Sequence, residues 1–310
     1  MHATAVILRE PEHLMLGEVA LVPPGADDIV VDVAWSGIST GTERLLYDGR
    51  MPPFPGMGYP LVPGYEAVGR VAEAGDASGR RVGETVFVPG SRGFEGVNGL
   101  FGASASRLVL PGHRAVPVDA QLGERGVLLA LAATAFHAVI SGPLPELIVG
   151  HGVLGRLIAR IAVALDGQPT VWERNPARRE GADGYEVVDA DRDPRRNYRT
   201  ICEASGSAGL LDDLVMRLAR GGEIVLAGFY EERLSFAFPA AFMKEARLRI
   251  AAEFAPGDVQ AVIRLVDEGR LSLDGLVTHR RPAVDASEAY RTAFGDPACL
   301  KMVLDWSARP

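Results

Sequence analysis

The chain has 310 residues, enough for two domains of ordinary size that each have their own hydrophobic core. Hydrophobic residues make up 47% and charged residues 23%, which is typical of a soluble globular protein. The net charge of -8 argues against a nucleic-acid partner, because a phosphate backbone is held by clustered Lys and Arg.

The N-terminus and the apolar segments predict a cytoplasmic protein without a transmembrane segment. No uncharged apolar run reaches the ~18 residues that span a membrane, and the N-terminus is charged too early for a signal peptide. The two cysteines, Cys202 and Cys299, are too few for a disulfide framework or a cysteine-rich zinc lobe. We therefore expect buried, inert thiols.

Residues 1–122 are expected to form a β-rich catalytic domain. Short apolar runs separated by Pro and Gly predict strands at residues 5–8, 29–35, 66–72, 84–88 and 106–110. A series of strands without intervening helices is typical of a partly open barrel.

A glycine-rich turn marks a second domain, expected over residues 123–254. A long apolar helix begins near Glu124, and a strand at residues 146–149 then leads into Gly150-x-Gly152-x-x-Gly155 and another apolar helix. In dinucleotide-binding proteins the first glycine turns the chain, the second admits the pyrophosphate, and the third lets helix and strand pack closely. The helix N-terminus then faces the phosphates with its partial positive charge. His151, between two of these glycines, is expected to point to solvent.

Glu173 ends the next predicted strand, at residues 169–173, and predicts NAD as the cofactor. A carboxylate at this place accepts hydrogen bonds from the adenosine ribose and repels the 2′-phosphate of NADP. Arg174, Arg178 and Arg179 follow it and could attract that phosphate, but we interpret them as a solvated face.

The rest of the chain alternates strands with helices, which predicts a parallel sheet wound on both faces, the Rossmann architecture. Further strands are expected at 185–190, 200–205, 223–229 and 249–254, with a helix at 208–220. Residues 255–310 are expected to return to the catalytic domain and complete its barrel, with helices at 258–268 and 286–294 and strands at 276–280 and 300–306. The predicted fold class is therefore α/β, a partly open barrel plus a doubly wound parallel sheet.

The predicted cofactor site lies at the glycine turn and at the carboxyl ends of the parallel strands, where ligands bind in such folds. Its residues come from the turn, from the helices on either side of it and from the ends of later strands. They are Gly150, Gly152, Val153, Leu154, Gly155, Glu173, Arg174, Thr134, Ser205 and Gly228.

Five segments together resemble the medium-chain dehydrogenase/reductase superfamily along essentially the whole chain. They are Gly37-Ile-Ser-Thr-Gly-Thr-Glu43, Pro63-Gly-Tyr-Glu-Ala-Val-Gly69, Ala133-Thr-Ala-Phe-His-Ala138, the glycine turn, and Arg220-Gly-Gly-Glu-Ile-Val225. Zinc-dependent members of the superfamily hold a metal with a Cys after the first Gly-Ile and with the His-Glu of a Gly-His-Glu triplet.

The chain departs from that zinc pattern. Ser39 or Thr40 stands in place of the cysteine, and Tyr65 stands in place of the histidine, which leaves only Glu66. Because zinc prefers thiolate and imidazole ligands, one carboxylate with neutral hydroxyls does not suit it. We therefore expect no bound metal.

Within the superfamily, residues 36–47 together with Gly64-Tyr65-Glu66 resemble the bacteriochlorophyllide dehydrogenases of bacteriochlorophyll biosynthesis, a pathway of photosynthesis. The resemblance implies NAD-dependent oxidation of the 3-(1-hydroxyethyl) group of a bacteriochlorophyllide to an acetyl group. A flat apolar macrocycle needs an apolar slot. Candidates for its lining are the aromatic and methionine side chains Met51, Phe54, Tyr59, Phe94 and Phe229.

Without a metal to acidify the alcohol, hydrogen-bonding side chains must handle its proton. The resemblance assigns Thr42 to the superfamily's proton-relay hydroxyl. Ser39 and Tyr65 stand where metal ligands would be, and Glu66 is the carboxylate that remains to act as base or to orient them. These four residues are the predicted catalytic set.

Two other functions stay open. A zinc-free quinone or enoyl reductase that uses NADPH would share the fold and lack the metal, but it should lack an acid at position 173. A non-catalytic redox sensor would bind NAD and turn over nothing. The sequence also leaves the oligomeric state open, with a homodimer as one option.

Overall fold

The computed structural model describes residues 1–53 and 56–307, and their contacts divide the chain into two compact units. The first unit comprises Met1–Ala130 and Asp274–Pro310, and the second comprises Leu131–Leu273.

These boundaries fall later than residues 122 and 254, where the sequence predicts them. The chain after residue 254 still packs on the second unit, because Arg160 donates to the carbonyl oxygen of Ser272 at 2.8 Å. Arg270 likewise donates to the carbonyl oxygen of Ala164.

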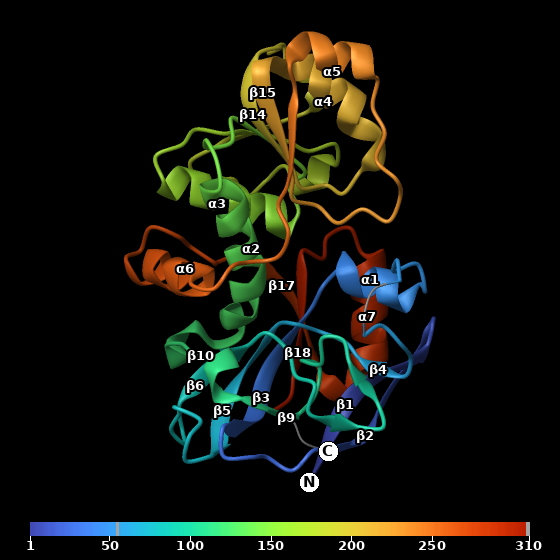
Figure 1. Cartoon of the computed structure of the whole chain (residues 1–310), viewed down its shortest axis with the longest axis vertical. Helices are drawn as coiled ribbons and strands as arrows, with labels where there is room; N and C mark the ends of the chain where they lie inside the picture. Colours follow the sequence, from blue (N-terminus) through green and yellow to red (C-terminus); the bar gives the residue numbers. More distant parts are fainter. Residues whose placement is uncertain (54–55, 308–310) are drawn as a thin grey trace. The chain divides into compact units, whose positions relative to one another are not determined.

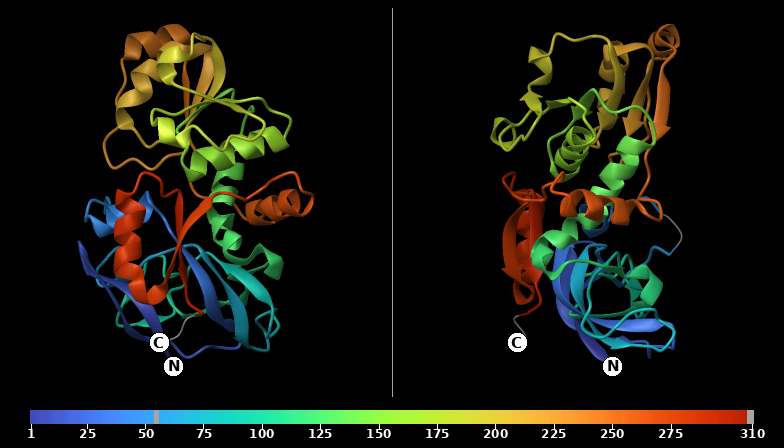
Figure 2. Two further views of the ribbon diagram at one scale, coloured as in Figure 1. Left: turned by 180° about the vertical axis from the view of Figure 1, so that it is seen from behind. Right: turned by 90° about the vertical axis from the view of Figure 1, so that its left-hand side faces the viewer.

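In the described part of the first unit the strands form two sheets, ordered β7-β2-β1-β4-β8 and β10-β6-β5-β3-β18-β17, with β9 paired to β3. The strands are β1 His2–Glu10, β2 His13–Leu21, β3 Asp28–Ile38, β4 Leu61–Val62, β5 Ala67–Ala74, β6 Thr85–Val88, β7 Phe94–Glu95, β8 Asn98–Gly99, β9 Arg107–Pro111, β10 Val116–Pro117, β17 Val277–Pro282 and β18 Lys301–Asp305. The helices are α1 Thr42–Tyr47 and α7 Ala286–Gly295, with short 3-10 helices η1 Gly112–Arg114, η2 Ala120–Leu128 and η6 Ala283–Asp285. Figure 2 shows these strands curving round, which confirms the predicted partly open barrel.

β3 is the strand around which the first unit is built. It pairs with β5 along most of its length, with β9 over its first residues and with β18 over its last. Ile29, Val30 and Val31 are fully buried, and a run of apolar residues buried on both faces is typical of a central strand. β3 ends at Ile38, so the segment that follows it starts directly from the core.

The second unit contains a parallel sheet, ordered β13-β12-β11-β14-β15-β16 in the part that the structure describes. The strands are β11 Leu147–Val149, β12 Thr170–Trp172, β13 Glu186–Val188, β14 Tyr198–Glu203, β15 Leu218–Leu226 and β16 Arg247–Ile250. The helices are α2 Leu129–Ile140, α3 Val153–Ala164, α4 Leu211–Arg217, α5 Phe238–Lys244 and α6 Asp258–Asp267, with 3-10 helices η3 Pro176–Arg178, η4 Ala190–Arg192 and η5 Ala208–Leu210. Helices α4 and α5 lie together beside β15 (Figure 1). The strand order reverses between β11 and β14, which confirms the predicted doubly wound sheet.

Several elements differ from the predicted ones. β2 and α5 have no predicted counterpart, because Gly17 and Glu18 interrupt the apolar alternation of β2 and α5 is only seven residues long. The helix predicted over 208–220 ends at Arg217, and β15 begins at Leu218. The strand predicted over 249–254 is β16, which ends at Ile250 opposite the last residue of β15.

One helical segment among the described residues, Ala120–Ile140, is long and apolar enough to cross a membrane by length and composition, with a mean hydropathy of 1.3. However, 56% of its most apolar window is buried inside the protein, and the core helix of a soluble protein passes the same test. Gly123, with φ of 52° and ψ of -134°, also breaks the helical conformation. The support for a membrane span is therefore weak, and its absence stays a prediction.

A buried ion pair joins the two sequence segments of the first unit. Lys301 Nζ lies 2.9 and 2.8 Å from the two carboxylate oxygens of Glu66, and it donates to the carbonyl oxygen of Ile38 at 3.2 Å. Glu66 is 0% and Lys301 is 1% exposed. Gly37 makes room for the pair, because a Cβ there would lie 2.1 Å from Glu66 Oε2.

Replacing Lys301 with Met should destabilise the protein by about 3–5 kcal/mol, because Glu66 would stay buried without its counter-charge. The free energy of unfolding in urea measures the change. The double variant Lys301→Met/Glu66→Leu is the control, since it removes both charges and should recover most of the loss. A Lys301→Met protein as stable as the wild type would contradict this role of the pair.

Candidate active site

Three hydroxyl side chains lie together in the first unit. The Tyr65 hydroxyl donates to Ser39 Oγ at 2.6 Å, and the Thr42 side chain lies close enough to the Tyr65 hydroxyl to lower its pKa. Ser39 directly follows β3, Thr42 is the first residue of α1, and Tyr65 comes just before β5. We call these three residues the hydroxyl cluster, and it unites three of the four predicted catalytic residues.

Tyr65 acts in this cluster as a neutral phenol. Its burial and the nearby Glu66 raise its pKa above the usual range, so it keeps its proton at neutral pH. Its ring packs edge-on against Phe101, with the ring centroids 5.6 Å apart. Tyr65 is therefore suited to donate and orient hydrogen bonds rather than to remove a proton.

Glu43 is a buried carboxyl beside the cluster that the sequence analysis did not select. It is 1% exposed, accepts the backbone N–H of Ser39 at 2.9 Å, and accepts the Tyr290 hydroxyl at 2.5 Å. Burial raises its pKa to about 7, against the lowering effect of these two hydrogen bonds. A carboxyl that titrates near neutral pH beside a group of hydroxyls is suited to proton handling. The sequence offered one indication of Glu43, because this residue ends the Gly37–Glu43 motif.

Glu66 faces Lys301 in the ion pair described above. Burial raises the pKa of Glu66, and the ammonium group of Lys301 acts in the opposite direction. Because both carboxylate oxygens contact Lys301, the geometry favours the orienting role of Glu66 over the role of base. Lys301 itself could have been suspected from the sequence, since a lysine inside an apolar strand needs a buried partner.

The donor atoms at this site do not fit a catalytic zinc. Ser39 and Tyr65 carry protonated hydroxyls, and the carboxylate of Glu66 is neutralised by Lys301. Among residues 1–53 and 56–307, no three His, Cys, Asp or Glu side chains are grouped so that they could hold a metal ion. The set lacks the thiolate and imidazole ligands that zinc takes in proteins.

The glycine turn of the second unit fits a dinucleotide. Gly150 has φ of 98°, and a Cβ at Gly155 would lie 1.9 Å from the Gly150 carbonyl oxygen, so both positions require glycine. A Cβ at Gly152 would meet nothing within 4 Å, which leaves open space at the N-terminus of α3. Backbone N–H groups at such a helix N-terminus bind phosphates.

Glu173 lies directly beside this turn. Its Oε2 accepts the backbone N–H of His151 at 3.0 Å, and its Oε1 accepts that of Asn175 at 2.8 Å. His151 does not point to solvent as expected: it is 0% exposed, because its ring hydrogen-bonds the Arg178 carbonyl oxygen and the Tyr185 hydroxyl. The carboxylate that predicts NAD is thus fixed to the turn through the backbone of His151.

Two further predicted residues, Ser205 and Gly228, follow the carboxyl ends of β14 and β15. A Cβ at Gly150 would lie 3.1 Å from Ser205, and one at Gly228 would lie 3.2 Å from Glu203 Oε2. Glu203 is 1% exposed and accepts the hydroxyls of Ser205 and Tyr230. The sequence places the Glu203 end of its strand at the ligand-binding edge of the sheet and Tyr230 near the expected cleft, but neither was selected as a site residue.

The other predicted cofactor residues lie on the predicted helices or next to Glu173. Val153 is buried and Leu154 half-buried in the first turn of α3, Thr134 is half-buried on α2, and Arg174 is exposed after Glu173. Their contacts with a cofactor stay predictions.

The residues predicted to line the macrocycle site differ in how much of each side chain is exposed. Met51 and Phe94 are 4% and 7% exposed and pack in apolar core clusters, so they offer little surface to a ligand. Tyr59 is half-buried against one of these clusters, and Phe229 is 52% exposed at the end of β15. Phe54 lies outside the described residues.

Comparisons with known proteins agree with this geometry. Residues 25–120 match the alcohol dehydrogenase GroES-like domain. The chain is 57% identical over 310 residues to the 2-desacetyl-2-hydroxyethyl bacteriochlorophyllide A dehydrogenase of Rhodobacter capsulatus and 58% identical over 316 residues to that of Cereibacter sphaeroides, with 99% of each chain covered. Its fold is similar to that of an Escherichia coli CFT073 short chain alcohol dehydrogenase solved with NADH, with a TM-score of 0.84 at 21% identity over 98% of this chain and 99% of that one.

The raised pKa of Glu43 predicts that stability depends on pH. The unfolded carboxyl ionises near 4.5 but the folded one only near 7, so the folded state loses stability as the pH rises through this window. Glu43→Gln keeps the shape of the side chain and cannot ionise, so the variant should not lose this stability. As the pH rises from about 4.5 to about 7, the free energy of unfolding of the variant should therefore increase relative to that of the wild type, by up to about 3 kcal/mol. Tyr290, Glu66, Lys301 and Tyr65 also face this carboxyl, and they are present in both proteins.

Denaturant unfolding of both proteins from acid to neutral pH measures this difference. Glu288→Gln is the matched control, because Glu288 is an exposed glutamate of the same unit, and its difference from the wild type should stay flat. Parallel pH profiles for Glu43→Gln and the wild type would show that Glu43 is already ionised in the folded protein.

Proposed function

The chain belongs to the family of 2-desacetyl-2-hydroxyethyl bacteriochlorophyllide A dehydrogenases, and from this premise we propose that it oxidises the 3-(1-hydroxyethyl) group of a bacteriochlorophyllide to a 3-acetyl group. We assign NAD as the cofactor, and no metal ion takes part. The observation that carries the proposal is the hydroxyl cluster, which stands where zinc-dependent relatives of the superfamily need metal ligands. The reaction belongs to bacteriochlorophyll a biosynthesis in the cytoplasm.

The chemistry divides between the cofactor and the protein. Bound NAD would supply the hydride acceptor, so the alcohol would lose a hydride from its carbon atom and a proton from its hydroxyl, and the products would be the ketone, NADH and one proton. We assign the alcohol oxygen to a hydrogen bond with the Thr42 hydroxyl, while Tyr65 and Ser39 orient that hydroxyl. Glu43, held by the backbone of Ser39, is the nearby carboxyl that suits the far end of this proton path.

Glu173 supports the choice of NAD over NADP. Its carboxylate is held beside the glycine turn by the backbone N–H groups of His151 and Asn175. These bonds leave it free oxygen lone pairs for a ribose diol, while its charge repels a 2′-phosphate.

A homodimer would cover the apolar surface at one edge of the second unit. β16 ends the sheet within the described residues, and Ile250 is 77% exposed on it. Phe238, Phe242 and Met243 of α5 are also more than half exposed. Unpaired strand edges and large apolar patches usually mark interaction surfaces. Sedimentation of the purified protein should therefore show two copies, and Ile250→Arg should shift it towards one.

The direct test is to incubate the purified protein with 3-(1-hydroxyethyl) bacteriochlorophyllide a and NAD. The pigment absorption band should shift to that of the acetyl product while NADH fluorescence appears. NADP should support a slower reaction, chelators should leave the rate unchanged, and elemental analysis should find no stoichiometric zinc. An unchanged pigment would refute the substrate, and activity lost together with one equivalent of zinc would refute the metal-free mechanism.

Thr42→Val should lower kcat by about 10²-fold, because it keeps the shape and removes the hydroxyl that relays the proton. The affinity for NAD should stay unchanged, since the predicted nucleotide contacts lie in the second unit. Steady-state kinetics and nucleotide titration measure the two effects.

Tyr65→Phe and Glu66→Gln extend this test. A Thr42→Val enzyme with normal kcat would move the relay to Tyr65 or Glu66. If all three variants were fully active, the active site would not lie at the hydroxyl cluster.

A further inference from the structure

A buried arginine directly follows the third glycine of the turn. Arg156 is 5% exposed, and a guanidinium that leaves water needs hydrogen-bond partners for its N–H groups. Its partners are the carbonyl oxygens of His151 at 3.0 Å, Arg178 at 2.8 Å, Glu180 at 2.7 Å and Gly181 at 3.3 Å. One side chain thus ties the glycine turn to the loop that follows β12.

This loop, residues 174–181, is shaped for that contact. We call it the β12 loop. Gly181 has φ of 80°, a conformation that favours glycine, and a Cβ there would lie 2.6 Å from Arg156 Nη1. The loop is also closed on itself, because Arg179 donates to the carbonyl oxygens of Glu173 at 2.8 Å and Arg174 at 3.1 Å.

His151 makes a second tie between the turn and the β12 loop. Its Nδ1 lies 2.6 Å from the Arg178 carbonyl oxygen, which can only accept, so Nδ1 carries the proton. Burial lowers the pKa of His151 to about 4, so the ring is neutral at pH 7 and Nε2 accepts the Tyr185 hydroxyl at 2.8 Å. Every polar atom of the ring is thus used inside the protein, which leaves His151 no direct role in chemistry.

We propose that Arg156 and His151 are positioning residues that hold the β12 loop and Glu173 in the nucleotide-binding arrangement before the cofactor arrives. The ligand is the adenosine end of the cofactor, a ribose diol next to a diphosphate, and the inference rests on the proposed NAD-binding role of this unit. Neither side chain touches the nucleotide.

Preorganisation of this kind affects both affinity and discrimination. A loop that is already ordered costs less entropy when the ligand binds. The loop also carries Arg174 and Arg178, which could approach a 2′-phosphate if the ties were released, whereas Glu173 repels it. Loosening the loop should therefore weaken NAD binding and reduce the preference for NAD over NADP.

Arg156→Lys tests the proposal, because it keeps the positive charge and loses the multiple hydrogen bonds of the guanidinium. Calorimetric titration of the full chain should show Kd values for NAD and for ADP-ribose that rise together by about tenfold or more. The ratio of the NADP Kd to the NAD Kd should fall. These titrations contain no macrocycle. A negative result would therefore overturn the positioning role and leave the proposed substrate untouched.

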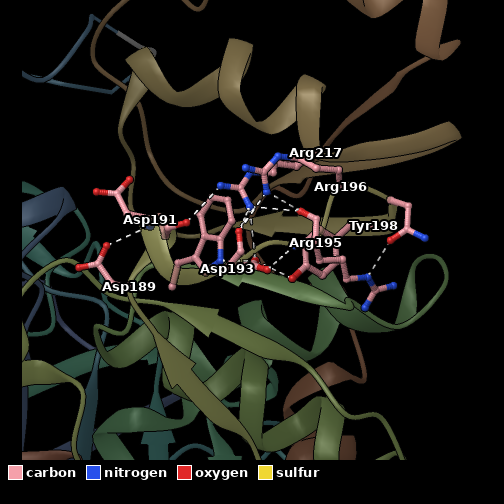
Figure 3. A network of polar contacts seen from close by, with 10 residues as sticks. Asp189, Asp191, Asp193, Arg195, Arg196, Tyr198 and Arg217 are labelled. Carbon is pink, nitrogen blue, oxygen red and sulfur yellow. Dashed lines mark hydrogen bonds and ion pairs between the residues drawn. The ribbon is translucent and has the colours of Figure 1, made fainter.

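Arg217→Lys is the matched control. Arg217 is also mostly buried in the same unit and also donates to loop carbonyl oxygens, those of Ala190 at 3.1 Å and Arg195 at 3.2 Å. Figure 3 shows Arg217, the last residue of α4, beside Asp193 of the segment that leads into the amino end of β14. Its hydrogen bonds go to residues 190–195 and not to the glycine turn. Its substitution should lower thermal stability and leave both nucleotide affinities unchanged.

The outcomes distinguish a role of Arg156 in nucleotide binding from a role in protein stability alone. If Arg156→Lys lowers thermal stability as Arg217→Lys does but binds NAD, NADP and ADP-ribose like the wild type, the proposal is overturned. If Arg156→Lys does not fold, His151→Phe, which keeps an aromatic ring and deletes the bonds to Arg178 and Tyr185, should raise the Kd for NAD and ADP-ribose at least threefold. Wild-type affinity in that variant would also overturn the proposal.

Discussion

The buried pair of Glu66 and Lys301 is the interaction on which the first unit depends. It is out of water, so neither charge is tolerated alone, and each fixes the place of the other. Glu66 adjoins Tyr65 in the chain, and Lys301 also binds the carbonyl oxygen of Ile38, which precedes Ser39. The backbones that carry the hydroxyl cluster are therefore positioned by one salt bridge between distant parts of the sequence.

The two units prepare for the reaction in different ways. In the first, the carboxyl groups of Glu43 and Glu66 are buried next to the neutral hydroxyls of the cluster and do not contact water. Glu43 is the clearest case, because burial raises its pKa to about 7. In the second, the carboxylate of Glu173 accepts the backbone N–H of His151, and the side chain of Arg156 donates to the His151 carbonyl oxygen. Proton transfer needs groups that can change charge, whereas nucleotide binding needs groups that do not move.

The parts of this protein that could be predicted from the sequence are those with local signals. The glycine turn, the strand before it and Glu173 lie within one short segment, and apolar periodicity is enough to find them. Glu43 and Tyr290 are 247 positions apart, and Glu66 and Lys301 are 235 apart, so no local pattern connects them. The same reason explains why the sequence suggested an exposed His151 and a macrocycle contact for Met51, since burial depends on contacts between distant segments.

The ion pair also has a consequence for the order in which the protein is made. A ribosome adds about 5–20 residues per second, so Lys301 follows Glu66 by about 12–47 s. During this interval the second unit, which is continuous in sequence, can fold completely, while the edge of β3 that will receive β18 stays open. The nascent chain must therefore carry an unpaired strand edge and an uncompensated carboxylate until β18 emerges, and during this interval it is most exposed to aggregation.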